Sequence, residues 1–171
     1  RQMCIRDSIS VVHNGIIDNA ASVRAQLQAD GVEFSSDTDT EVLAHLIARS
    51  DATTLEAAVL ETLGRVTGTY ALAVIDEQHP ERVVVARSGS PLIIGVGEKE
   101  MFVASDVAAL VRHTNRVVHL EDGELATVTA QGFRTFDRAS NATDRTPVEI
   151  SVAAEDLEPV SYTHLTLPTI L

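Results

Sequence analysis

A close succession of short β-type runs fills the second half of the chain and limits the possible folds more than any other feature. Each run is rich in Val, Ile, Thr or aromatic residues, and turn-forming residues such as Gly89, Gly97, Gly123 and Gly132 separate the runs. The short spacing leaves no room for crossover helices, so most neighbouring strands are expected to pair antiparallel. The expected strands read TYALAVID, ERVVVAR, PLIIGVG, EMFVASD, NRVVHL, GELATVT and GFRTFD.

Helical patterns precede these strands. In the first, Val23 and Leu27 lie four residues apart, and Gly31 is expected to end the helix. The TDTE sequence at residues 38–41 has the form of a capping box and is expected to begin a second helix. An apolar stripe follows it over residues 42–47, which is typical of a helix that packs on a core.

A third helix is expected after Thr53 and Glu56, which repeat the same capping signal, with Leu55 and Val59 on its apolar face. Residues 106–110 are expected to form at most one helical turn. Helices followed by a run of strands predict an α+β layered domain.

Length and charge favour one soluble domain. The 171 residues are enough to bury a core, and acidic residues outnumber basic ones 25 to 13, for a net charge of -12 with no block of like sign. Nucleic acid and anionic membrane surfaces are therefore not expected as partners. No apolar run reaches the ~18 residues of a membrane span, and the expected location is the cytoplasm.

The two ends of the chain differ from its middle in their sequence pattern. MCIRDS near the start and VSYTHLTLPT near the end look like translations of one transposase-type sequencing adapter in opposite orientations. We therefore interpret residues 1–8 and 160–171 as adapter-derived and exclude them from fold reasoning. Residues 9–138 are then a partial domain, and residues 139–159 the start of an interdomain linker. The only cysteine, Cys4, falls in the first adapter-derived segment.

Asn14 and Gly15, within VVHNGIIDN, are expected where a strand ends and allow two interpretations. An Asn-Gly pair can form an ordinary tight turn. Alternatively, the Asn side-chain amide and the Gly backbone N–H converge on one point, which is how an oxyanion hole for acyl transfer is built. In that case Gly15 is required because no Cβ can intrude on a bound carbonyl.

Asp39, at the start of the second expected helix, also allows two interpretations. A carboxylate near a helix N-terminus gains about 0.3 to 1 kcal/mol from the helix dipole and needs no ligand. Alternatively, Asp39 receives the α-ammonium group of an amino-acid substrate. That role requires a negative charge that no neighbouring cation neutralises.

No metal or cofactor is expected. The histidines show no metal-ligand spacing, and a surface or hydrogen-bonded role is the simpler interpretation for each. A single cysteine excludes a disulfide or a thiolate metal cluster within the chain. SGSPLIIG lacks the Gly-Lys-Ser/Thr ending of a phosphate loop and is interpreted as a turn entering a sheet.

The combination of motifs resembles the class II glutamine amidotransferase domain over residues 11–129. The HNG and TDTEV motifs are shared by several class II enzymes. The Ile-Ile-Asp-Asn continuation and the SGSPLIIG form favour the aminosugar-forming branch, the glutamine:fructose-6-phosphate aminotransferases or glucosamine-6-phosphate synthases, over the phosphoribosyl-diphosphate amidotransferases. In chain order, the resemblance rests on VVHNGIIDN, SDTDTEVLAHLI, GTYALAVID, ARSGSPLIIG, FVASD and LEDGELATVT.

The resemblance implies a four-layer α/β/β/α sandwich of antiparallel sheets, of the N-terminal-nucleophile (Ntn) hydrolase type. It assigns Asn14 and Gly15 to the oxyanion hole and Asp39 to the α-amino group of glutamine. Family chemistry is attack by an N-terminal cysteine thiolate on the glutamine side-chain amide, with the enzyme's own α-amino group as base. The ammonia then passes to a sugar-isomerase half that converts fructose 6-phosphate to glucosamine 6-phosphate, in an enzyme expected to be a homo-oligomer.

The chain departs from the family at its start. The nucleophile and the early Arg, Thr and His positions of the family should precede Val11, and this sequence lacks them. Cys4 cannot substitute, because its amine is in a peptide bond and Ile5 stands where the family has Gly. The chain as written is therefore expected to be inactive. A phosphoribosyl-diphosphate amidotransferase, a non-catalytic glutamine-binding module and a purely structural Ntn-like domain are the alternatives.

Overall fold

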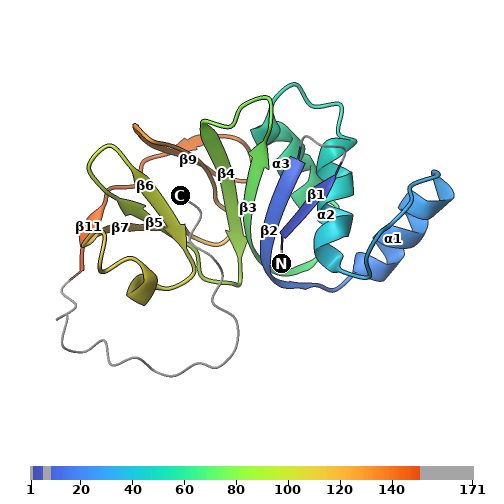
Figure 1. The fold of residues 1–171 in the computed structure, drawn as a ribbon, viewed down its shortest axis with the longest axis horizontal. Coiled ribbons are helices and arrows are strands. Elements are labelled where there is room, and N and C mark those ends of the chain that lie inside the picture. The colour runs from blue at the N-terminus through green and yellow to red at the C-terminus, as the bar shows by residue number, and fades with distance from the viewer. Residues whose placement is uncertain (1, 6–8, 151–171) are drawn as a thin grey trace.

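Two antiparallel sheets, with helices on one outer face, form the protein (Figure 1). The computed structural model describes residues 2–5 and 9–150. The mixed α+β architecture built on two antiparallel sheets is confirmed. The helices are α1 (Ala20–Ala29), α2 (Asp39–Ala48), α3 (Leu55–Leu63) and the 3-10 helix η1 (Val107–Ala109).

The first sheet has the strand order β1-β2-β3-β4-β8-β9-β10, and the second has the order β11-β7-β5-β6. Every expected strand of the second half of the chain is present, with bounds shifted by a few residues at most. The strands of the first sheet are β1 (Gln2–Ile5), β2 (Ile9–Ile17), β3 (Gly68–Asp76), β4 (Arg82–Ser88), β8 (Leu125–Thr129), β9 (Gly132–Phe136) and β10 (Ala142–Thr143). Those of the second are β5 (Ile93–Val96), β6 (Met101–Ala104), β7 (Arg116–His119) and β11 (Val148–Glu149).

Apolar side chains on the two faces of the first sheet build two separate cores, because successive side chains of a strand point to opposite faces. On one face, Val11 and Leu72 pack against Leu43 of α2 and Val59 of α3. The opposite face packs on the second sheet, with Val85, Ala126 and Val128 against Leu92, Ile94, Val118 and Leu120. Figure 1 shows the helices and the second sheet on opposite sides of β2, β3 and β4.

The outer face of the second sheet is covered by η1 and the residues that follow it. Leu110 is buried there against Ile93, Phe102 and Val117. This turn occupies the position of the fourth layer in an α/β/β/α sandwich. The expectation of at most one helical turn at residues 106–110 is confirmed, and Asp106 caps it by accepting a hydrogen bond of 2.9 Å from Ala108 N–H.

SGSPLIIG is a turn that leads into β5, as the sequence predicts. Gly89 has a φ of +72°, which is strained for any residue with a Cβ. The Asp122 carboxylate fixes the turn by accepting hydrogen bonds from Gly89 N–H at 2.9 Å and from the Arg87 guanidinium at 2.8 Å.

The structure describes only part of the two predicted adapter-derived ends and of the predicted linker. Residues 2–5, predicted to be adapter-derived, pair with β2 in register Cys4 to Ser10. An edge strand presents unpaired N–H and C=O groups to any extended segment beside it, so this pairing needs no particular sequence. The predicted linker, 139–159, contributes β10 and β11 in its first part. The rest of that linker and the predicted adapter-derived segment 160–171 lie outside the described residues.

Candidate functional site

Strand β2 runs straight through Asn14 and Gly15. Its register with β3 is continuous from Ile9 to Ile17 and sets Asn14 opposite Ala71 and Gly15 opposite Tyr70. The expectation that the strand ends at this pair is wrong, and so is the tight-turn interpretation. Hydrogen-bonded pairing with β3 outweighs the local preference of Asn-Gly for a turn, since strand preferences depend strongly on tertiary context.

Gly15 is required by the fold itself. Its φ is +142°, and a Cβ built on it would lie 2.1 Å from the carbonyl oxygen of Thr69 on β3. Real Cβ atoms do not approach an oxygen so closely. The sequence suggested that a bound carbonyl would exclude a side chain here, whereas the structure shows that the neighbouring strand already does so.

The side chains of His13 and Asn14 lie on opposite faces of β2. His13 is 5% exposed on the face that packs against the helices, and Asn14 is exposed on the other. The side-chain amide of Asn14 makes no hydrogen bond to another described residue. An exposed amide of this kind is available to a ligand.

Asp39 is the first residue of α2, and its carboxylate contacts the end of β2. Oδ2 accepts a hydrogen bond from Ile17 N–H at 3.1 Å, and Oδ1 lies 3.5 Å from Nδ1 of His13. The Asp39 side chain is 27% exposed, so solvent reaches the carboxylate. The structure therefore brings Asp39 to the same half of β2 that carries Asn14 and Gly15.

His13 leaves the charge of this carboxylate uncompensated at neutral pH. Burial lowers the pKa of His13 below its usual value of 6.5, although the nearby Asp39 opposes the shift. The imidazole is therefore neutral at pH 7. Within the described part of the chain, no Lys or Arg forms an ion pair with Asp39. Position and charge thus suit a cationic group arriving from solvent.

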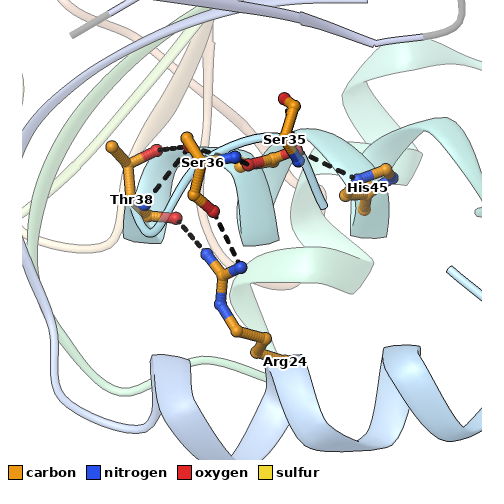
Figure 2. A network of polar contacts seen from close by, with 6 residues as sticks. Arg24, Ser35, Ser36, Thr38 and His45 are labelled. Carbon is orange, nitrogen blue, oxygen red and sulfur yellow. Dashed lines mark hydrogen bonds and ion pairs between the residues drawn. The ribbon is translucent and has the colours of Figure 1, made fainter. Parts of the chain in front are cut away.

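Glu41 does not form the predicted capping box. Thr38 is the N-cap of α2 but makes no capping hydrogen bond with its side chain. The Glu41 carboxylate instead accepts hydrogen bonds from the N–H and Oγ–H groups of Ser35, at 2.6 and 2.9 Å, and of Ser36, both at 2.7 Å (Figure 2). Four donors outside the helix stabilise a buried carboxylate better than the single N–H of a capping box.

These hydrogen bonds determine the protonation of Glu41. Burial alone would raise the pKa of this carboxyl, but the donors from Ser35 and Ser36 outweigh it and lower the pKa to about 2. Nε2 of His45 lies 3.7 Å from Oε1 of Glu41, one helical turn further on. Burial lowers the pKa of His45, against the opposing effect of Glu41.

The remaining histidines of the described residues do not assemble into a site. His79 faces Glu81 at 3.6 Å on the surface, and the ring of His113 packs against Phe102 with centroids 5.0 Å apart. Among the described residues, no group of three or more His, Cys, Asp or Glu side chains could hold a metal ion. None of the helices described is long and apolar enough to cross a membrane.

Comparison with known proteins points to one family. A family model described as a glutamine amidotransferase domain matches residues 2–112. The chain is 40% identical over 98% of its length to a glutamine–fructose-6-phosphate aminotransferase (isomerizing) of Chlorobaculum tepidum. It is 46% identical over 96% of its length to the protein of the same name from Idiomarina loihiensis. The chain spans only 28% and 27% of these two relatives.

Solved structures show the same fold. The glutamine phosphoribosylpyrophosphate amidotransferase of B. subtilis matches with a TM-score of 0.69 and 30% identity, over 81% of this chain and 31% of that one. A glutamine aminotransferase class-II domain protein of Silicibacter pomeroyi matches with a TM-score of 0.56, over 80% of this chain and 68% of its own. At 18% identity, the second similarity concerns the fold alone.

Proposed function

Since the chain belongs to the glutamine amidotransferase domain family, we propose that it is the glutaminase part of an aminosugar-forming enzyme. That enzyme hydrolyses the side-chain amide of glutamine and passes the ammonia to fructose 6-phosphate, which becomes glucosamine 6-phosphate. The names of the relatives and their identity of 40% and 46% support this acceptor. We further propose that the complete enzyme is a cytoplasmic homo-oligomer.

The position of Asp39 is the observation that carries the proposal. Its carboxylate is anchored to Ile17 N–H on the strand that presents Asn14 and Gly15, yet it remains partly open to solvent. A fixed negative charge at this point suits the α-ammonium group of glutamine, because hydrogen bonds between charged partners are the strong ones.

Asn14 and Gly15 are proposed as the oxyanion hole. Attack on the glutamine amide places negative charge on its oxygen, and the Asn14 side-chain NH₂ and the Gly15 N–H are donors of the required kind. The nucleophile is the thiolate of an N-terminal cysteine, whose own α-amino group takes up the thiol proton and later gives it to the amide nitrogen, which departs as ammonia. Water then releases glutamate from the thioester.

The chain of residues 1–171 is proposed to be inactive in this form. Cys4 has no free α-amino group, and Ile5 follows it where the family has glycine. Removal of the nucleophile from a catalytic group of this kind costs on the order of a millionfold in turnover. Purified chain should release no glutamate from glutamine above background. Release that scales with the amount of chain and falls in the Asn14→Ala variant would contradict this.

The decisive experiment uses the intact enzyme, meaning this domain with an N-terminal cysteine and the acceptor half in place. With glutamine and fructose 6-phosphate it should form glutamate and glucosamine 6-phosphate in equal amounts. With glutamine and phosphoribosyl diphosphate it should form no phosphoribosylamine. The reverse result would assign the domain to the second candidate, which the structural similarity to the B. subtilis enzyme supports.

A glutamine-binding module without catalysis is the remaining candidate. It would bind glutamine through Asp39 but would have no cysteine after the initiator methionine. Continuous reading of the DNA upstream of this segment distinguishes the two. A Met-Cys-Gly start supports the enzyme, and any other second residue supports the binding module.

A further inference from the structure

Glu41 is a buried charge two residues after Asp39, and its hydrogen bonds all run to the segment before Asp39. Its side chain is 2% exposed and accepts from four donors of Ser35 and Ser36. Burial of a carboxylate is costly unless hydrogen bonds or opposite charges compensate it. Here the compensating hydrogen bonds come from the short turn at residues 35–38, and the same hydrogen bonds fix the conformation of that turn.

Arg24 of α1 holds the same turn from the other side. Its guanidinium donates to the carbonyl of Ser36 at 2.8 Å and to that of Thr38 at 2.9 Å, and it lies 4.1 Å from the centre of the Phe34 ring. Figure 2 shows the Arg24 side chain reaching from α1 toward Ser36 and Thr38. The backbone that enters Asp39 is therefore held from two sides.

We infer that Glu41 is a positioning residue for the recognition of the α-ammonium group of glutamine, acting through Ser35 and Ser36 on the direction of the Asp39 carboxylate. This rests on the proposed function of Asp39. Asp39 accepts a hydrogen bond of 3.1 Å from Ile17 N–H, and its other carboxylate oxygen lies 3.5 Å from Nδ1 of His13. Both partners belong to β2, so the direction in which the carboxylate approaches them depends on the backbone that leads into Asp39.

A purely structural role makes a different prediction. If Glu41 only stabilises α2, its loss lowers the stability of the domain and the amount of folded enzyme. It then leaves the discrimination between ligands with and without an α-ammonium group unchanged. The positioning role alters this discrimination in the folded enzyme.

The test is Glu41→Gln in the intact enzyme. The amide keeps the shape of the side chain, but its NH₂ group cannot accept hydrogen bonds, so one side of the network is lost. Two substrates are compared: glutamine, and 4-carbamoylbutanoate, which is glutamine without the α-amino group. We expect the ratio of their kcat/KM values to fall about tenfold through the KM for glutamine, with kcat/KM for 4-carbamoylbutanoate changed less than about threefold.

Glu56→Gln is the matched control. Glu56 lies in the first turn of α3, accepts a hydrogen bond of 2.8 Å from Thr127 and faces Arg82 at 3.5 Å. Within the described part of the chain, Glu56 makes no hydrogen bond or ion pair with the turn at residues 35–38. Its loss should lower the melting temperature and leave the substrate ratio unchanged.

The outcomes separate this inference from the proposed function. A folded Glu41→Gln enzyme with the unchanged ratio overturns the positioning role, provided that Asp39→Asn lowers the ratio. If Asp39→Asn also leaves the ratio unchanged, the proposed role of Asp39 fails. Should Glu41→Gln not fold, Ser36→Ala decides, because it removes one donor and keeps the backbone N–H. It should lower the ratio about threefold, and an unchanged ratio overturns the inference.

Discussion

The backbone N–H of Ile17 donates a hydrogen bond of 3.1 Å to Oδ2 of Asp39, and this bond joins the first residue of α2 to the last residue of β2. The two elements are separated by α1 in the sequence. The contact holds a solvent-accessible carboxylate beside the strand that bears Asn14 and Gly15. A charge and two potential donors thus belong to one rigid unit, which is the condition for recognising both ends of a small amino acid.

Asp39→Asn should weaken glutamine binding without unfolding the domain. The amide oxygen can still accept from Ile17 N–H, but the charge is lost. We expect KM for glutamine in the intact enzyme to rise about ten- to a hundredfold, as for the loss of a charged hydrogen bond. Asp106→Asn is the control, because Asp106 also accepts a backbone N–H at a helix start, far along the chain. Equal KM values in the two variants would return Asp39 to a structural role.

Asn14→Ala should lower turnover more than affinity. If Asn14 donates to the oxyanion, the loss in kcat for glutamate release is about a hundred- to a thousandfold. Asn19→Ala is the control, because the Asn19 amide bridges Arg65 O at 3.0 Å and Thr67 N–H at 2.9 Å within the fold. Asn19→Ala should lower thermal stability and leave kcat nearly intact. A change below about threefold for Asn14→Ala would exclude the oxyanion role.

Gly15→Ala and Gly132→Ala separate backbone strain from steric overlap. Both glycines have a positive φ, +142° and +154°, but a Cβ at Gly132 meets nothing within 4 Å. Gly132→Ala should cost about 1–3 kcal/mol in the free energy of unfolding, from conformation alone. Gly15→Ala should cost about 1–3 kcal/mol more, because Thr69 O must move. Urea unfolding measures the cost of each substitution in the free energy of unfolding. Equal costs would show that Thr69 O on β3 moves away from the added Cβ at no measurable cost.

The layered fold was predictable because its signals are local and repeated. Val23 and Leu27 mark α1, and Leu55 and Val59 mark α3, since an apolar face at helical spacing has few other uses. The cap of α3 is shifted by one residue: Thr54, not Thr53, accepts from Ala57 N–H, at 3.2 Å. Neighbouring threonines offer the same chemistry, and only the packing of the helix selects between them.

The details of the candidate site were less predictable because they depend on contacts across the fold. Asn14 lies within a strand only because β3 pairs with it, and β3 begins more than fifty residues later. The contact between His13 and Asp39 joins two elements whose proximity no local pattern indicates. Glu41 has the spacing of a capping box, yet Ser35 and Ser36 offer it four donors and displace that arrangement.

The charge of Glu41 should make the stability of the domain depend on pH in a defined window. Its pKa in the folded chain is about 2, below the ordinary value of 4.5, so the folded state favours the charged form. The stabilisation is therefore complete above about pH 5, where the unfolded chain is also ionised, and is lost as the pH falls through 4.5 toward 2. At 1.36 kcal/mol per pKa unit, its full size is about 3 kcal/mol.

The difference between the original chain and Glu41→Gln isolates this contribution, because other carboxylates titrate alike in both. Urea unfolding at several pH values between 6 and 2 should give a difference in unfolding free energy that is constant above pH 5. Below that it should shrink by about 3 kcal/mol as Glu41 is protonated. A difference independent of pH down to 2 would mean that the donors of Ser35 and Ser36 do not hold a charged carboxylate. The turn before Asp39 would then have another anchor, Arg24 being the one the structure offers.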